Sequence, residues 1–275
     1  MPFSSLNSDT STSPTPRGAV TTGTLQMTDL RRSFGGALVI DVPSLTIPAN
    51  GVVAIIGPNG AGKTTLFDLV SGYVRPSGGR IHFDGASMHG RAPDYRARKG
   101  LVRTFQLTRV FERLTVLENM LIGSLPGRHL TFGNSVIRWR RSIRDWSAAE
   151  EQAFGLLSQV GLENRSSVIA SELSGGQKKL LEFSRAQMAN PSMLLLDEPL
   201  AGVGPGIRDQ ILEHIRDFVS AGRGVVLVEH DLPRVMKVAD RVVVLDRGQV
   251  IADGSPNEIA DDPRVMTAYL GGRVK

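Results

Sequence analysis

Cysteine is absent from the 275 residues of this sequence. The chain therefore has no disulfide framework, no thiolate metal ligand and no cysteine nucleophile, and it is compatible with a reducing compartment. Long apolar runs are absent as well. The longest, residues 193–196 and 225–228, have the length of a strand, whereas a helix that spans a bilayer needs about 18 apolar residues or more. We therefore expect that the chain does not cross a membrane by itself.

Large apolar side chains are scarce in the first 23 residues. This segment is rich in Ser, Thr and Pro, with Pro14 and Pro16 close together. Such a composition buries too little surface to offset the entropy lost on ordering, which predicts a disordered tail over residues 1–23. The segment also lacks the apolar central region of a secretory signal.

The rest of the composition is that of a globular protein, with 41% hydrophobic and 21% charged residues. The length fits one large α/β domain or a domain with an appended subdomain. The 32 basic residues outnumber the 27 acidic ones, which gives a net charge of +5. This balance permits an anionic partner such as a nucleotide, a nucleic acid or a lipid headgroup, without choosing among them.

Hydrophobic periodicity predicts an α/β fold. Alternating segments point to an antiparallel edge sheet, whereas a continuous apolar strand followed by a glycine-rich loop and a helix is typical of a parallel sheet. A second strand–helix–strand unit, a hairpin and a mostly helical insertion follow the same reasoning. In that order, the segments are 25–30 and 38–47, then 52–56 and 64–71, then 193–196, 207–221 and 225–228, then 242–252, and finally 113–161 for the insertion.

The glycine-rich loop matches G-x-x-x-x-G-K-[ST] between a predicted strand and a predicted helix. Its backbone N–H groups are expected to cradle phosphate oxygens, Lys63 to bind the β- and γ-phosphates, and Thr64 to bind Mg²⁺. This predicts an ATP-binding loop made of Gly57, Pro58, Asn59, Gly60, Ala61, Gly62, Lys63, Thr64 and Thr65.

Two acidic residues follow the apolar run at 193–196. Asp197 stands at the strand end, where a phosphate loop needs a carboxylate to hold Mg²⁺. The next residue, Glu198, is placed to orient or deprotonate the attacking water. Kinases, GTPases, helicases and transport ATPases share these two features, so the class must be decided elsewhere.

A short motif decides it: Leu173, Ser174, Gly175, Gly176 and Gln177. The serine and the two glycines at a predicted helix N-terminus present N–H groups to an anion. The motif resembles the signature of the ABC ATPase family, and Ser174 precedes Asp197 by 23 residues, in the order of that family. A P-loop kinase, the competing enzyme class, would not need this motif.

The resemblance implies a P-loop NTPase core of ABC type over residues 24–275. The core would combine a parallel sheet with an antiparallel β edge subdomain, an inserted helical subdomain at about 107–190 and a C-terminal family tail at about 255–275. It further implies a head-to-tail dimer with an identical or paralogous ATPase, in which each signature motif contacts the ATP of the partner subunit.

The same resemblance assigns further site residues one by one. Gln106 matches the glutamine loop, which touches Mg²⁺ and the water and relays motion to a membrane partner. His230 matches the switch histidine, which contacts the γ-phosphate. Phe34 lies where the family places an aromatic ring against adenine, the alternative being a core phenylalanine. The predicted catalytic residues are thus Glu198, His230 and Gln106, and the predicted Mg²⁺ ligands are Thr64, Gln106 and Asp197.

Less specific phrases resemble the ATP-binding subunits of branched-chain amino acid uptake systems. They lie at 102–106, 114–119, 199–203 and 262–271, together with the helical stretch 126–150. The resemblance implies an ATPase that drives import through separate permease subunits, with a solute-binding protein in the full complex. It places the chain in the cytoplasm, peripheral on the cytoplasmic face of the membrane. ATPases of urea uptake and lipopolysaccharide export look similar and remain alternatives.

An ABC ATPase that acts on nucleic acid without a transporter is a further alternative. The basic pI and the cluster of Arg138, Arg140, Arg141 and Arg144 would suit phosphate binding, although a solvated helical face explains the cluster equally. Such proteins commonly carry two cassettes, whereas this chain has one phosphate loop and one signature, which makes a nucleic-acid partner the less favoured interpretation.

One position departs from the family pattern. Gly204 stands where the family usually has Asp or Asn, whose side chain bonds across the dimer interface. Glycine has no side-chain donor or acceptor. We therefore expect slower or less tightly coupled ATP hydrolysis than in proteins that carry the polar residue.

Overall fold

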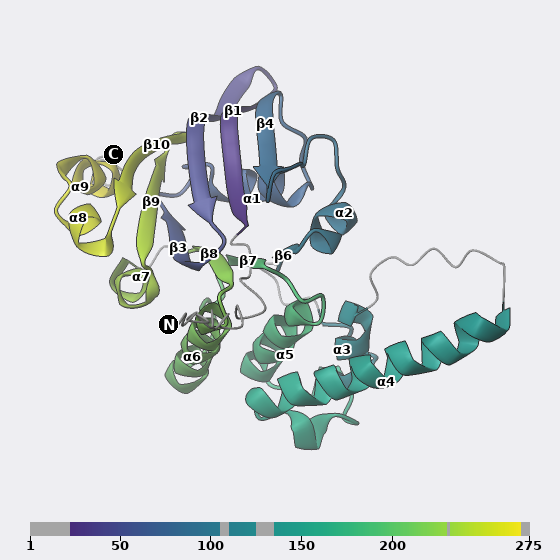
Figure 1. The fold of residues 1–275 in the computed structure, drawn as a ribbon. Helices are drawn as coiled ribbons and strands as arrows, with labels where there is room; N and C mark the ends of the chain where they lie inside the picture. Colours follow the sequence, from purple (N-terminus) through teal and green to yellow (C-terminus); the bar gives the residue numbers. More distant parts are fainter. Residues whose placement is uncertain (1–22, 105–109, 125–134, 230–231, 271–275) are drawn as a thin grey trace, which may run out of the picture.

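The computed structural model describes residues 23–104, 110–124, 135–229 and 232–270 (Figure 1). Residues 1–22 of the predicted tail 1–23 and the predicted site residues Gln106 and His230 lie outside the described residues. Among the helices that are described, none combines the length and apolarity that a bilayer crossing requires.

A six-stranded sheet forms the centre of the molecule, in the order β10-β9-β3-β8-β7-β6. Its strands pair in parallel except for the β9–β10 hairpin. The central strands are apolar and buried nearly throughout, because helices cover parallel sheets on both faces. The strands are β3 (Gly51–Ile56), β6 (Leu101–Arg103), β7 (Met193–Asp197), β8 (Gly224–Val228), β9 (Arg241–Asp246) and β10 (Gln249–Gly254).

A four-stranded antiparallel sheet lies beside it, in the order β2-β1-β4-β5 (Figure 1). Its strands are β1 (Thr24–Phe34), β2 (Ala37–Pro48), β4 (Gly78–Phe83) and β5 (Ala86–Ser87). Gly35 and Gly36, both with positive φ, form the turn between β1 and β2. Alternate side chains of this sheet pack on helix α1 (Lys63–Ser71) in one of the two hydrophobic clusters.

Three helices gather to one side of the sheets: α3 (Val116–Ser124), α4 (Ser135–Gln159) and α5 (Gly175–Gln187) (Figure 1). Two short 3₁₀ turns, Glu163–Arg165 and Ala170–Glu172, connect α4 to α5. The remaining helices are α2 (Pro93–Arg98), α6 (Pro205–Ser220), α7 (Leu232–Val238), α8 (Pro256–Ala260) and α9 (Pro263–Leu270).

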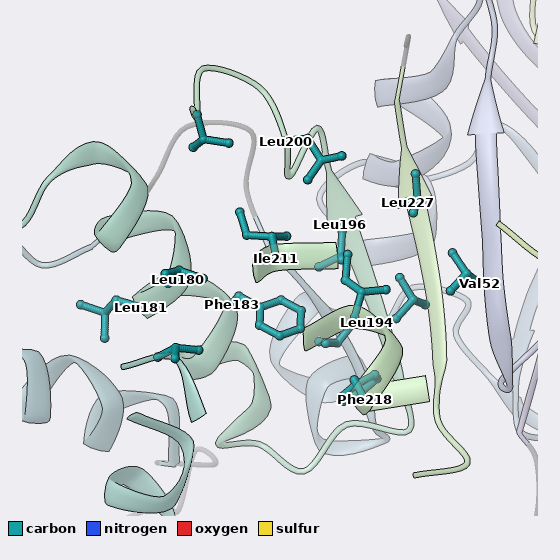
Figure 2. Close-up of a cluster of buried hydrophobic side chains, with 14 of the residues drawn as sticks. Val52, Leu180, Leu181, Phe183, Leu194, Leu196, Leu200, Ile211, Phe218 and Leu227 are labelled. Carbon is teal, nitrogen blue, oxygen red and sulfur yellow. The ribbon is translucent and has the colours of Figure 1, made fainter. Parts of the chain in front are cut away.

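A shared hydrophobic cluster joins the three helices to the central sheet. Phe183 of α5 packs between the strand residues Leu194 and Leu196 of β7 and the helix residues Ile211 and Phe218 of α6 (Figure 2). The same cluster therefore contains side chains of α5 and of β7, the strand that ends at Asp197.

A buried arginine fastens α2 to the C-terminal end of α1. The Arg96 side chain is only 2% exposed, and it donates hydrogen bonds to the carbonyl oxygens of Leu69 at 2.7 Å, Val70 at 2.5 Å and Met88 at 2.9 Å. Burial lowers the pKa of Arg96 to about 10. The guanidinium faces the negative end of the helix dipole and satisfies carbonyls that the helix itself leaves open.

The α/β class predicted from the sequence is confirmed, with a parallel sheet, an antiparallel edge sheet and added helices. The limits 24–275, 107–190 and 255–275 stay predictions. The segment from β4 to β6, residues 78–103, had no predicted structure, because its strands are short and its only helix has six residues.

Candidate nucleotide-binding site

The phosphate loop, residues 57–62, connects β3 to α1 at the carboxyl end of the central sheet. Glycine is required at Gly57, where φ is +153° and a Cβ atom would lie 2.0 Å from the carbonyl oxygen of Leu245. The same holds at Gly62, which has φ +99° and whose Cβ would lie 3.0 Å from the Val39 carbonyl oxygen. The backbone at Leu245 and Val39 thus lies so close to the loop that larger residues would not fit at these two positions.

Lys63 begins α1 and turns back into the loop. Its Nζ donates hydrogen bonds to the carbonyl oxygens of Gly57, at 2.7 Å, and Pro58, at 3.0 Å. Burial lowers the pKa of Lys63, and the negative charges of Glu198 and Asp197 oppose this shift. The structure therefore brings the predicted loop cation and the two predicted carboxylates close enough to interact electrostatically.

The end of β7 carries both predicted carboxylates. Asp197 is 2% exposed, and its Oδ2 accepts a hydrogen bond from Arg103 at 2.8 Å. The Glu198 backbone has a positive φ of +47°, and its N–H donates to the Val228 carbonyl oxygen at 3.0 Å. A positive φ outside glycine is uncommon and marks a conformation that the surroundings impose.

Sequence reasoning missed Arg103. The side chain of this residue is 7% exposed, and it joins Asp197 to Asp68 of helix α1, whose Oδ1 lies 2.5 Å from the guanidinium. Its position at the end of a three-residue strand gives no pattern that would have singled it out. The one available signal was its place three residues before the predicted glutamine loop.

The segment that leads to His230 is anchored next to the site. Glu229 is buried, and its Oε1 accepts a hydrogen bond from the backbone N–H of Leu200 at 3.2 Å. Leu200 belongs to the segment that follows Glu198. The chain after β8 is thereby tied to the chain after β7, while His230 itself lies outside the described residues.

The signature motif forms the beginning of α5. Ser174 is the N-cap: its Oγ accepts from the Gln177 N–H at 3.2 Å, and Gln177 Oε1 accepts from the Ser174 N–H at 3.0 Å. Ser174 and Gly175 are exposed. Gly176 must stay small, because a Cβ there would lie 2.7 Å from Ile207 of α6. The ordinary capping role and an exposed helix N-terminus therefore coexist in one motif.

Phe34 ends β1 and is not a core residue, since it is 44% exposed. The Arg32 guanidinium lies 4.3 Å from the centre of its ring. The core alternative weighed from the sequence is therefore wrong, and the ring is accessible to a ligand.

Gly204 is the N-cap residue of α6, with φ −67° and ψ 164° and no side-chain cap. A Cβ at this position would meet nothing within 4 Å. The backbone and the space around Gly204 would both accept the Asp or Asn that the family pattern has here.

Comparisons with known proteins bear on these assignments. The profile of the ABC transporter family matches residues 40–201, and the profile described as branched-chain amino acid ATP-binding cassette transporter matches residues 249–275. The high-affinity branched-chain amino acid transport ATP-binding protein BraF of Pseudomonas aeruginosa is 39% identical over 90% of this chain and 97% of its own length. LivG of Escherichia coli, which bears the same description, is 34% identical over 90% of this chain and 97% of its own length.

Solved structures agree with these relatives. A crystal structure of the ADP conformation of an ATP-binding cassette of an ABC transporter superimposes with a TM-score of 0.76 at 33% identity, over 91% of this chain and 100% of that one. A nucleotide-free cassette gives 0.75 at 33% identity, over 90% and 98% of the two chains. The resemblance inferred from the signature motif is confirmed.

Proposed function

This chain belongs to the ABC transporter family, and from that premise we propose that it is the ATP-hydrolysing subunit of an uptake system for branched-chain amino acids. The observation that carries the substrate class is the match of residues 249–275, which include β10, α8 and α9, to the branched-chain profile. The two relatives described above are branched-chain transport proteins by name. This favours amino acids over urea, lipopolysaccharide and nucleic acid.

As a member of this family the chain binds ATP and couples its hydrolysis to transport. In the proposed site Lys63 exchanges its bonds to Gly57 and Pro58 for bonds to the β- and γ-phosphates. Glu198 accepts the proton of the attacking water, and His230 holds the γ-phosphate. Positioning and charge stabilisation supply most of the rate in such a transfer.

The residues proposed for Mg²⁺ fit that ion. The Thr64 hydroxyl, the Asp197 carboxylate and the Gln106 amide offer hard oxygen atoms, the ligands that Mg²⁺ prefers. Thr64 is exposed at the second position of α1, and Asp197 is nearly enclosed at the end of β7. When bound, the ion would neutralise charge that develops on the phosphates.

The exposed signature motif supports a head-to-tail dimer. Ser174 and Gly176 of one subunit would complete the ATP site of the other, because Ser174 and Gly175 are exposed at the N-terminus of α5, the end of a helix that favours an anion. Closure of the dimer would move the permease subunits through the segment around Gln106. A solute-binding protein and a position on the cytoplasmic face of the membrane complete the proposal.

Transport assays in cells test the substrate class. A strain that lacks the chromosomal copy would be complemented with the wild-type chain or with Glu198→Gln, and uptake of labelled leucine, isoleucine, valine and urea measured. We expect the wild-type chain alone to restore uptake of the three amino acids, with urea unchanged. If the wild-type chain restores urea uptake, or if amino acid uptake is the same with and without it, the substrate would have to be reassigned.

Purification from native membranes tests the partners. The tagged chain, solubilised in mild detergent, should retain polytopic membrane subunits, a second ATPase and an amino-acid-binding protein. Ribosomal or DNA-repair proteins without membrane subunits would overturn the transporter assignment, while the ATPase chemistry would stand.

A further inference from the structure

We propose that Arg103 is a positioning residue that fixes the carboxylate of Asp197 relative to helix α1, and so sets the strength of Mg²⁺ binding to the nucleotide site. The proposal rests on the proposed role of Asp197 as a Mg²⁺ ligand. Arg103 itself is not placed in contact with nucleotide or metal.

The guanidinium of Arg103 bonds two structural elements at once. One arm donates from Nη2 to Asp197 Oδ2 at 2.8 Å, on β7. The other arm donates from Nη1 to Asp68 Oδ1 at 2.5 Å and to Ser71 Oγ at 2.9 Å, both on α1. A planar guanidinium holds its arms in a fixed geometry, so the two elements cannot shift independently while these bonds last.

These are the two elements that carry the proposed Mg²⁺ ligands of the described chain. Thr64 is the second residue of α1, one helical turn before Asp68, and Asp197 is the last residue of β7. The spacing of hydroxyl and carboxylate therefore depends on how α1 sits against β7. Arg103 spans that contact with a side chain that is 7% exposed, and burial shields its bonds from competition by water.

Aromatic rings restrict the guanidinium further. Its central carbon lies 5.6 Å from the centre of the Phe67 ring and 5.8 Å from that of Tyr73. These rings limit the rotamers open to Arg103, as contacts of this kind favour a cation above an aromatic face. The orientation of Asp197 is thus set by a residue that is itself held in place.

The backbone extends the connection toward the glutamine loop. Arg103 ends β6, and the next residue, Thr104, donates its N–H to the Leu195 carbonyl oxygen of β7 at 2.9 Å. Residues 105–109 follow directly. The described chain is thus held to β7 on both sides of the Arg103 side chain, up to Thr104.

Binding measurements test the proposal without relying on turnover. The purified chain is saturated with the non-hydrolysable analogue AMP-PNP, Mg²⁺ is titrated, and the concentration that gives half of the Mg²⁺-dependent rise in Tm is recorded. Nucleotide affinity in EDTA is measured alongside. For Arg103→Met we expect the half-saturating Mg²⁺ concentration to rise about tenfold or more, as for other residues that orient metal ligands, with affinity in EDTA within about twofold of wild type.

Two further variants make the result specific. Asp68→Asn weakens the anchor of Arg103 on α1 without removing it, because the amide oxygen still accepts a hydrogen bond from the guanidinium. It should therefore raise the half-saturating Mg²⁺ concentration, but by less than Arg103→Met does. Arg103→Lys keeps the positive charge but loses the planar, two-armed guanidinium. Its half-saturating Mg²⁺ concentration should lie between those of wild type and Arg103→Met. Should Arg103→Met fail to fold, Arg103→Lys decides in its place: a raised half-saturating Mg²⁺ concentration supports the proposal, and an unchanged one overturns it.

The opposite results are equally informative. If Arg103 merely neutralised charge, its loss would make the site more negative and would lower the half-saturating Mg²⁺ concentration. That result, an unchanged value, or an equal loss of affinity in EDTA would overturn the proposal. Asp197→Asn separates this failure from that of the proposed function: an unchanged Mg²⁺ dependence in Asp197→Asn would refute Asp197 as a ligand, whatever Arg103 does.

Discussion

At the scale of single residues, we assign nucleotide binding to Lys63 and the chemical step to Glu198. Lys63 begins α1, and its side chain turns back into the phosphate loop, whereas Glu198 follows the end of β7 with a positive φ. We predict that Glu198→Gln binds ATP normally but loses turnover by about 10² to 10⁴, the usual contribution of a general base. Lys63→Ala should instead weaken binding. Equilibrium binding and steady-state phosphate release separate the two.

The contradicting outcome for this pair is simple to state. Full turnover in Glu198→Gln would show that another group accepts the proton. Normal ATP affinity in Lys63→Ala would show that the amide groups of the loop suffice for binding, and that the lysine acts on the transition state alone.

Gly204 allows two consequences of one substitution to be measured separately. An Asp there finds open space and becomes the N-cap of α6. We predict that Gly204→Asp raises the free energy of unfolding by about 0.5 kcal/mol through capping. It should also raise ATP turnover by about fivefold, the equivalent of one hydrogen bond of ~1 kcal/mol across the dimer interface.

Gly204→Ala is the control, since it adds a Cβ without an acceptor and should produce neither gain. Urea unfolding and phosphate release report the two effects. If Gly204→Asp gains stability but its turnover does not change, the expectation that Gly204 slows hydrolysis is wrong, and the position matters only for capping α6.

At the scale of elements, α2 is a brace for the phosphate-loop helix. We predict that Arg96→Met lowers the free energy of unfolding by about 3 kcal/mol, because it leaves enclosed carbonyls of α1 without donors. Arg98→Met, on the same helix, removes only an exposed pair with Asp94 and should leave stability nearly unchanged. Equal urea midpoints for the two variants would contradict the bracing role.

Some elements of the fold could be predicted from the sequence, and others could not. The loop, β7 and the hairpin were predictable because glycine spacing, apolar runs and the Arg247–Gly248 turn are local signals. Arg96 and Arg103 were not, because the partners that join them to other elements are distant in the sequence: the carbonyls of α1 lie 26 and 27 residues from Arg96, and the two carboxylates lie 35 and 94 residues from Arg103. The strand order, with β3 between β8 and β9, likewise depends on crossovers that no local pattern reveals.

At the scale of the whole molecule, the proposed dimer would depend on Ser174, a serine that also has a structural role in its own subunit. Ser174 caps α5, so a disruptive substitution would confuse capping with recognition. Asp and Asn both cap helices well and have the same shape. We predict that Ser174→Asp abolishes ATP-dependent dimerisation in the Glu198→Gln background, because its charge repels the triphosphate of the partner. Ser174→Asn should retain part of it.

Light scattering coupled to size-exclusion chromatography gives the mass of each variant with and without ATP. ATP affinity of the monomer should be equal in the two variants, since each chain binds its own nucleotide at the phosphate loop. Equal dimerisation of Ser174→Asp and Ser174→Asn would argue against a phosphate facing the signature motif.

The place of β3 in the sheet has a consequence for the order in which the protein opens. Residues 52–56 are buried and paired on both sides, by β8 and by β9, whereas β6 is a three-residue strand at the sheet edge. Amide hydrogens of β3 should therefore exchange with deuterium only when the entire chain unfolds, and those of β6 through small local openings. The strand that opens last thus carries the proposed ATP-binding loop, and the strand that opens first carries Arg103 at its end.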